Sequence, residues 1–195
     1  MTVKISDKYE LNYWIKHRSD EHKCRSGKML HLFDLPNEID ICADVGCGPW
    51  CGIFQLYKST YMYAVDPLWS AYFKNNLQDI PPGVVTVSDC AEKFNLPQNA
   101  NIIISVNSLD HSGSLKNSIY NIMSNLVDNG LFYLHIHMRT KKQLNSGHKM
   151  SITEDNLDSI CSSWVVLQKN VYDQCPIENK PYKTYVAIMQ NSPRI

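Results

Sequence analysis

The 195-residue chain lacks any surplus of charge, because its 19 lysine and arginine residues balance its 19 aspartate and glutamate residues at a formal net charge of +0. No overall field therefore draws nucleic acid or a membrane surface to the protein, which disfavours a polynucleotide substrate. The chain also has no run of 18 consecutive apolar residues, and its first residues lack the apolar stretch of a secretory signal. We expect a cytoplasmic protein without a membrane partner.

Paired cysteine motifs are missing too. The seven cysteines are an odd number without a C-x-x-C pair, so no disulfide scaffold is expected. Several lie in apolar sequence, where a free cysteine usually acts as a small buried hydrophobe. Cys47 and Cys51 could share a metal, but no second ligand pair accompanies them, and we expect no zinc site there.

No internal repeat, low-complexity segment or linker divides the chain, whose length suits a single domain. Apolar runs that predict strands alternate with segments of helical periodicity and end in a strand pair. This order predicts an α/β fold with a doubly wound sheet, whose ligands bind at the carboxyl ends of the strands. Residues 1–38 are expected to form a helical N-terminal cap on a core of residues 39–195. Strands are expected at residues 41–45, 61–65, 84–87, 101–106, 131–138, 164–169 and 184–189, and helices at residues 9–23, 27–32, 67–75, 115–126 and 153–162.

Residues 41–54, ICADVGCGPWCGIF, indicate a buried strand, a tight glycine-rich loop and the start of another helix. Gly46 and Gly48 can adopt backbone angles that other residues avoid, and their lack of side chains lets a ligand lie against the backbone. Pro49 suits the first position of a helix, whose free N–H groups would face that ligand.

The spacing in this loop separates two classes of ligand. A dinucleotide site needs Gly-x-Gly-x-x-Gly, but here Cys51 occupies the place of the third glycine. Asp44, two residues before the first glycine, would repel a pyrophosphate and attract an ammonium or sulfonium group. The sequence DVGCGPW resembles the first motif of the class I S-adenosylmethionine-dependent methyltransferases.

This resemblance extends as a pattern over about residues 9–157. It implies the family's Rossmann-like fold, in which seven mostly parallel strands form one sheet with helices on both faces and an antiparallel last strand. It also implies S-adenosyl-L-methionine as the cofactor and a single methyltransferase domain over residues 1–195.

Acidic residues at the ends of two later strands extend the resemblance. Asp66, twenty residues beyond Gly46, suits hydrogen bonds from both ribose hydroxyls, a feature shared with NAD-binding proteins. Asp89 matches the family position that holds the adenine amino group, although it would also suit a helix N-cap. The resemblance implies a cofactor site made of Tyr13, Trp14, Asp44, Gly46, Cys47, Gly48, Asp66, Pro67, Asp89, Cys90, Ala91, Asn107 and Ser108.

Tyr13 and Trp14 belong to the first expected helix, and two roles are open for it. Its aromatic residues could simply cover the edge of the sheet. In the family, an N-terminal helix often closes over the cofactor, and the Tyr-Trp-x-x-x-Arg arrangement ending at Arg18 resembles the segment that reaches the cofactor's carboxylate.

The fourth expected strand ends in Val-Asn-Ser-Leu-Asp-His, residues 106–111. It lacks the prolines and the aromatic residue that amino-methylating nucleic-acid enzymes of this fold carry there. The Leu-Asp-His ending instead resembles enzymes that methylate oxygen or nitrogen of small molecules. We therefore expect His111, preceded by Asp110, to act as the catalytic base, because an unperturbed histidine titrates near neutral pH. The alternative is that His111 caps the next helix.

Three further histidines are candidates for contact with the substrate. His135 and His137 lie two residues apart on one expected strand, so they share a face. They suggest a metal only if His111 or His148 supplies a third ligand, and we expect no metal. His148 follows a glycine in a segment similar to one in small-molecule methyltransferases, although the family's Thr-Pro-Glu helix start lacks its proline here.

The sequence thus favours an S-adenosylmethionine-dependent methyltransferase that acts on oxygen or nitrogen of a small molecule. Three alternatives stay open: methylation of RNA or protein, a non-catalytic cofactor-binding protein, and a nicotinamide-dependent oxidoreductase. A nucleic-acid partner would rely on the basic rim, defined as Arg139, Lys141, Lys142, His148 and Lys149. The chain leaves room for only a small lid, so we also expect that a second copy could close the site as a homodimer.

Overall fold

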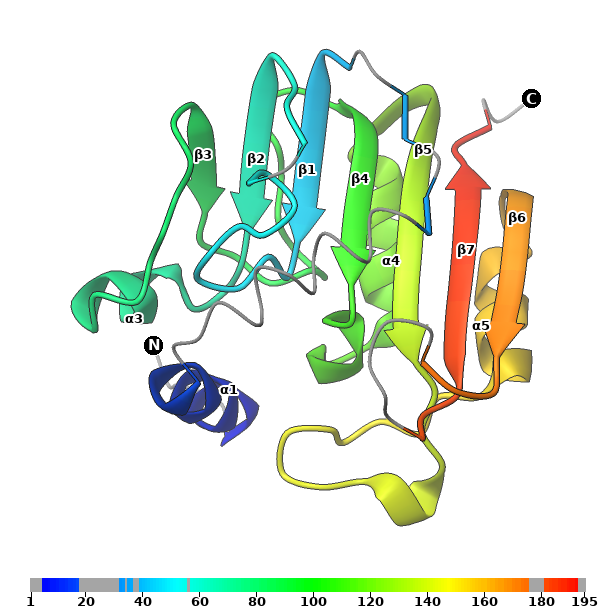
Figure 1. The fold of residues 1–195 in the computed structure, drawn as a ribbon. Helices are drawn as coiled ribbons and strands as arrows, with labels where there is room; N and C mark the ends of the chain where they lie inside the picture. The colour runs from blue at the N-terminus through cyan, green and yellow to red at the C-terminus, as the bar shows by residue number, and fades with distance from the viewer. Residues whose placement is uncertain are drawn as a thin grey trace.

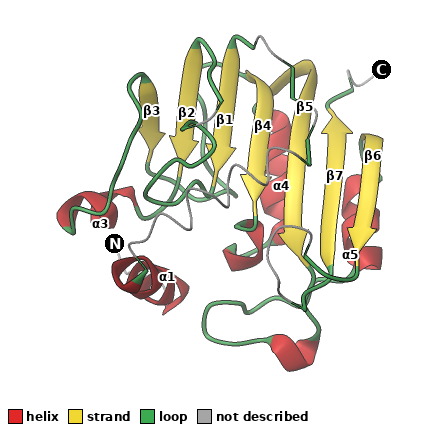
Figure 2. Ribbon diagram, viewed as in Figure 1, coloured by secondary structure: helices red, strands yellow, loops and turns green. Residues whose placement is uncertain are grey.

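The computed structural model describes residues 5–17, 32–33, 35–36, 39–55, 57–175 and 181–192. Within these ranges, seven strands form one sheet in the order β3-β2-β1-β4-β5-β7-β6 (Figures 1 and 2). The strands are β1 (Ile41–Val45), β2 (Tyr61–Val65), β3 (Val84–Val87), β4 (Ala100–Val106), β5 (Leu126–His137), β6 (Val165–Tyr172) and β7 (Thr184–Gln190).

The first five strands pair in parallel, and β7 runs antiparallel to both of its neighbours, β5 and β6. The predicted doubly wound sheet with an antiparallel last strand is therefore confirmed. The central strands β1 and β4 are apolar along nearly their whole length because both faces of the sheet are covered.

Helices α4 (Leu115–Ser124) and α5 (Glu154–Cys161) cover one face of the sheet and lie behind it in Figure 1. Their buried residues, such as Ile119 and Leu157, pack against the strand residues Ile103 and Leu134. The opposite face packs against α3 (Trp69–Lys74), which buries Trp69 and Tyr72, and against the turns that follow β1. Each face of the sheet therefore has its own hydrophobic core.

Side-chain caps fix where α4 and α5 begin. The Ser114 hydroxyl accepts a hydrogen bond from the Asn117 amide at the start of α4. The Thr153 hydroxyl accepts from the Asn156 amide at the start of α5. Such caps satisfy N–H groups that would otherwise lack an intrahelical partner.

The helix predicted to begin at Pro49 is wrong, because residues 49–55 form turns. Cys51 has φ of +46°, in the left-handed region, and such a residue cannot continue a right-handed helix. The loop after β1 therefore presents backbone groups through turns rather than through a regular helix.

The N-terminal helix α1 (Ile5–Lys16) is shorter than the predicted span of residues 9–23. Residues 18–23 and the short helix expected to start at residue 27 lie outside the described residues, and so does Arg18. Among the helices that are described, none has the length and apolar character needed to cross a membrane.

Candidate cofactor and acceptor site

A cavity of about 1340 Å³ opens at the carboxyl ends of the parallel strands. These ends point to one edge of the sheet, where α1 lies across them (Figure 1). The cavity is lined by every residue that the sequence assigned to the cofactor, from Tyr13 and Trp14 to Asn107 and Ser108. Of the other candidates, His111, His137 and His148 line it, whereas Asp110 and His135 do not.

The glycine loop packs so closely that two of its positions require glycine. Gly46 has φ of +75° and Gly48 has φ of +64°, both in the region that favours glycine. A Cβ atom at Gly46 would overlap the side chain of Ser108, and one at Gly48 would lie 3.1 Å from the Trp14 ring. The loop therefore leaves backbone, not side chains, at this part of the cavity wall.

Asp66 anchors the loop from the neighbouring strand. One carboxylate oxygen accepts a hydrogen bond from the Gly48 amide at 3.1 Å, and the other accepts from the Leu68 amide at 2.8 Å. Burial raises the pKa of Asp66 to about 6, although these two N–H groups lower it in part. The carboxylate thus fixes the loop while it borders the cavity.

Asp44 is the second buried carboxylate of this region. Burial raises the pKa of Asp44 to about 8, and the nearby charge of Asp66 adds to the rise. Two buried carboxylates in one part of the cavity wall favour a ligand that brings positive charge.

Asp89 lies where β3 ends, and its carboxylate accepts a hydrogen bond from the Cys90 amide at 2.8 Å. The residues that follow form a turn, in which the Phe94 amide bonds to the Cys90 carbonyl. No helix begins there, so the alternative role of Asp89 as a helix N-cap is wrong. Its side chain borders the cavity together with Ala91.

Ser108 ties the end of β4 to the end of β1. Its hydroxyl lies 2.9 Å from the Val45 carbonyl oxygen and 2.8 Å from the hydroxyl of Ser105. The residue before it, Asn107, has φ of +48° and donates its amide to the His135 carbonyl at 2.7 Å. This bend carries residues 107–111 from the sheet to the cavity wall.

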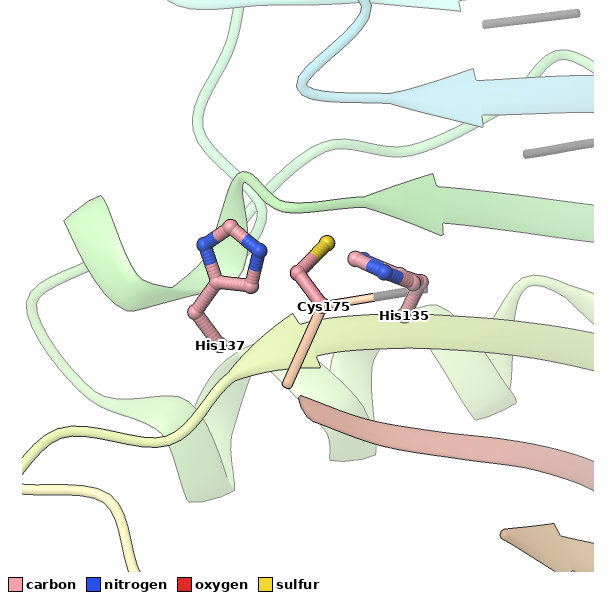
Figure 3. A group of neighbouring side chains, drawn as sticks. All are labelled: His135, His137 and Cys175. Carbon is pink, nitrogen blue, oxygen red and sulfur yellow. The ribbon is translucent and has the colours of Figure 1, made fainter. Parts of the chain in front are cut away.

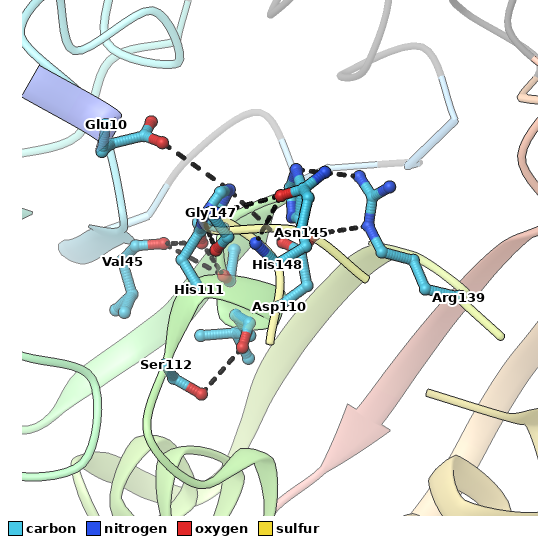
Figure 4. A network of polar contacts seen from close by, with 12 residues as sticks. Glu10, Val45, Asp110, His111, Ser112, Arg139, Asn145, Gly147 and His148 are labelled. Atoms are coloured by element: carbon cyan, nitrogen blue, oxygen red, sulfur yellow. Dashed lines mark hydrogen bonds and ion pairs between the residues drawn. The ribbon is translucent and has the colours of Figure 1, made fainter. Parts of the chain in front are cut away.

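His111 sits in the short 3₁₀ helix η1 (Leu109–His111), with its ring between charged partners (Figure 4). Nδ1 lies 3.0 Å from the Gly147 carbonyl oxygen. Nε2 lies 3.7 Å from a carboxylate oxygen of Glu10 and 3.8 Å from one of Asp110. Since a carbonyl oxygen only accepts, Nδ1 carries the proton and Nε2 has the lone pair of a base. His111 does not cap the next helix, where Ser114 is the cap.

Asp110 is buried and surrounded by positive or polarisable groups (Figure 4). One oxygen lies 2.7 Å from Nδ1 of His148 and 3.2 Å from Nε of Arg139. Burial alone would raise the pKa of Asp110, but its hydrogen bond to His148 and the charges of His111, His148 and Arg139 outweigh burial and hold the pKa well below its usual range. Asp110 therefore stays ionised.

The hydrogen bonds of His148 indicate which nitrogen carries its proton. Arg139 Nη2 lies 3.1 Å from Nε2 of His148, and an arginine can only donate. Nε2 is therefore the acceptor and the proton is on Nδ1, which faces Asp110. Since Arg139 is buried in this network, it does not belong to an exposed basic rim as the sequence analysis proposed.

Helix α1 contacts both ends of the cavity. The Trp14 ring lies against Gly48 and makes an edge contact with Trp50 at 5.1 Å between ring centroids. At the other end, the Tyr9 ring lies so close to Gly147 that a side chain there would collide with it. Of the two roles left open for this helix, the structure supports the one over the cavity.

Glu10 and Arg139 are the polar residues of the site that the sequence analysis missed or misplaced. Glu10 has no motif around it, and only the position of α1 brings it to His111. Arg139 lies two residues after the end of β5 in a basic stretch, so its sequence context suggests exposure rather than burial.

No family model matches the chain, and no curated protein matches it. Its fold is that of the class I S-adenosylmethionine-dependent methyltransferases. The N-methyltransferase NodS from Bradyrhizobium japonicum aligns with a TM-score of 0.63 and 10% identity over 89% of this chain and 97% of that one. NodS in complex with S-adenosyl-L-homocysteine aligns with a TM-score of 0.61 and 10% identity over 97% of this chain and 89% of that one.

A third structure of the same fold contains both a methyl acceptor and a cofactor product. It is the 1,6-didemethyltoxoflavin-N1-methyltransferase from Burkholderia thailandensis with bound 1,6-didemethyltoxoflavin and S-adenosylhomocysteine. It aligns with a TM-score of 0.61 and 12% identity, covering 87% of this chain and 77% of that one. At these identities the likeness establishes the fold.

Proposed function

We propose that this protein is an S-adenosyl-L-methionine-dependent methyltransferase that acts on oxygen or nitrogen of a small molecule. The observation that carries the proposal is one cavity with two different walls. The glycine loop and two buried carboxylates form one wall, and a histidine with its lone pair available lies on the other.

The first wall suits a cationic, nucleoside-containing cofactor. Asp66 borders the cavity beside the bare backbone of Gly48, as a ribose-binding carboxylate must. Asp44 has a raised pKa that a neighbouring ammonium or sulfonium group would lower. Solved structures of this fold contain S-adenosylhomocysteine, which supports the same cofactor here. Bound S-adenosyl-L-methionine would supply an electrophilic methyl group.

The second wall suits removal of a proton from the acceptor. The acceptor's hydroxyl or neutral amine would bond to the methyl group as S-adenosyl-L-homocysteine leaves, and Nε2 of His111 would take the proton that the oxygen or nitrogen loses. The imidazolium that forms lies within 3.8 Å of two carboxylates, Glu10 and Asp110, which stabilise it. Asp110 can stabilise the imidazolium because the nearby Arg139 guanidinium keeps the carboxyl group ionised.

The dimensions of the cavity favour a small acceptor. Its volume of about 1340 Å³ exceeds the roughly 300–1,000 Å³ of a typical single-ligand pocket, so it has room for a cofactor and a second compact molecule. The burial of Arg139 removes one charge from the basic rim, which weakens the case for RNA. Contact of His137 and His148 with the acceptor remains part of this proposal.

Calorimetric titration tests the cofactor first. The protein is titrated in parallel with S-adenosyl-L-methionine, S-adenosyl-L-homocysteine and NADH. We expect micromolar dissociation constants for the two sulfur compounds and no heat from NADH. Binding of NADH alone would overturn the proposal in favour of an oxidoreductase. A screen of small alcohols, phenols and amines as methyl acceptors then follows, with the release of S-adenosyl-L-homocysteine as the readout.

A further inference from the structure

Behind the cavity wall, the structure gathers three side chains that commonly bind transition metals (Figure 3). His135 and His137 share one face of β5, and Cys175 comes from the connection between β6 and β7. One ring nitrogen from each histidine and the cysteine Sγ all lie within 4.8 Å of one another. All three side chains are buried.

The two histidines stand on a rigid part of the sheet. β5 is hydrogen-bonded on both sides, with His135 opposite Val106 of β4 and Val186 of β7. His137 lies opposite Thr184 of β7. Ligands held on paired strands lose little freedom when an ion binds, which favours binding.

The donor set identifies the kind of ion. Two imidazoles and a thiolate suit Zn²⁺, whereas Mg²⁺ and Ca²⁺ require oxygen ligands that this group does not offer. In a tetrahedral zinc site, bond lengths of about 2.0–2.3 Å place the ligand atoms about 3.5 Å apart. The three ligand atoms lie within 4.8 Å of one another, so binding of an ion would draw them closer together.

We propose that His135, His137 and Cys175 bind a zinc ion. This goes beyond the methyltransferase activity, which needs no metal. The sequence analysis expected no metal because the third ligand would have to be His111 or His148, but the fold supplies Cys175 instead. Three protein ligands leave one position of the tetrahedron for water or a group of a bound molecule. His137 also lines the cavity, so the ion lies at the cavity wall.

A second group of metal-binding residue types, Asp110, His111 and His148, is a poorer candidate. Arg139 lies 3.2 Å from the Asp110 carboxylate, and its positive charge would repel a cation. Arg139 already neutralises the second group, which leaves the first group as the better candidate.

Cobalt provides the test, because a Co²⁺–thiolate bond gives a charge-transfer band in the near ultraviolet and Zn²⁺ quenches it by displacement. We expect the protein, freed of metal by a chelator, to bind one equivalent of Co²⁺ with this band. The band should be absent in Cys175→Ser and retained in the matched control Cys161→Ser, which alters another buried cysteine. His137→Gln should weaken Co²⁺ binding by about a hundredfold or more, because even the loss of an outer-shell partner costs about 10–100-fold.

Circular dichroism establishes that each variant is folded. The proposal fails if the folded wild type binds no Co²⁺, or if the band persists in Cys175→Ser, which would assign the thiolate to another cysteine such as Cys47. It also fails if His137→Gln binds Co²⁺ as tightly as the wild type. None of these readouts depends on S-adenosyl-L-methionine, so they are separate from the test of methyltransferase activity.

Discussion

Buried carboxylates lie near both ends of the cavity, and they differ in how their charge is balanced: Asp44 and Asp66 line one end, and Asp110 lies behind His111 at the other. Asp44 and Asp66, beside the glycine loop, have raised pKa values. Asp110, beside His111, has a lowered pKa because Arg139 and two histidines surround it. Arg139 supplies a cation at the second end, whereas the proposed function gives the first end a cationic ligand. We therefore call the first the binding end and the second the catalytic end, after the roles proposed for them.

The substitution Asp110→Ala should have the largest effect, because it removes the carboxylate that pairs with Arg139 at the second end. The substitution leaves the buried Arg139 without its carboxylate, so the free energy of unfolding should fall by about 3–5 kcal/mol. Urea denaturation followed by circular dichroism measures the change. The double variant Asp110→Ala/Arg139→Met removes the unpaired charge and should regain much of the loss. If the double variant is no more stable than the single one, the ion pair is not what stabilises this end.

The substitution His111→Ala should affect turnover and leave cofactor affinity unchanged, so it tests the function of the two ends rather than their stability. Turnover should slow by roughly a hundredfold or more, because the general base is removed. The affinity for S-adenosyl-L-methionine should stay nearly unchanged, since the glycine loop and Asp66 are untouched. Kinetics with a saturating cofactor, together with calorimetry, measure both quantities. Unchanged turnover would exclude His111 as the base.

Asp66→Ala should have the opposite pattern. We expect the affinity for S-adenosyl-L-methionine to fall by about 2 kcal/mol or more, because a charged acceptor and the anchor of Gly48 are lost together. Calorimetric titration measures this, and the stability of the Asp110 network should not change. Wild-type affinity in this variant would contradict the assignment of Asp66 to the ribose.

A smaller effect should appear in the pH dependence of cofactor binding. Asp44 has a pKa of about 8, so it is mostly protonated below that pH, and a cationic ligand must displace the proton. The affinity for S-adenosyl-L-methionine should therefore rise, by about tenfold between pH 7 and pH 9, as Asp44 loses its proton. Asp44→Asn should flatten the profile, and S-adenosyl-L-homocysteine, which lacks the sulfonium charge, should show a shallower rise. An affinity of the wild type that does not change with pH would show that the charge of Asp44 does not contribute to cofactor binding.

The sequence predicted which residues line the binding end better than it predicted the contacts at the catalytic end, and the spacing of the residues explains why. The hydrogen bonds of Asp66 reach residues 2 and 18 positions away, so one short motif and the next strand contain the whole arrangement. The contacts of Asp110 and His111 reach residues 29 and 36 positions away, and Glu10 comes from a separate helix. Contacts between residues so far apart in the sequence cannot be predicted from a short motif.

The errors in the prediction have local causes. The helix expected after Pro49 would need right-handed helical backbone angles throughout, whereas the backbone of Cys51 adopts a left-handed conformation. The burial of Arg139 is not predictable from the sequence, because its neighbours in sequence are basic. The strand order was predictable because the alternation of strands and helices leaves few ways to build a doubly wound sheet.

Helix α1 connects the two ends in a way that affects the timing of turnover. Trp14 rests on Gly48 at the binding end, and Tyr9 rests on Gly147, whose carbonyl orients His111, at the catalytic end. In the proposed enzyme, a molecule that leaves the cavity past α1 would disturb the same helix, so we expect the release of both products to depend on one motion. Lid motions of this kind take microseconds to milliseconds and often limit kcat. Glycine substitutions within α1 would then change the rate of product release without altering either wall of the cavity.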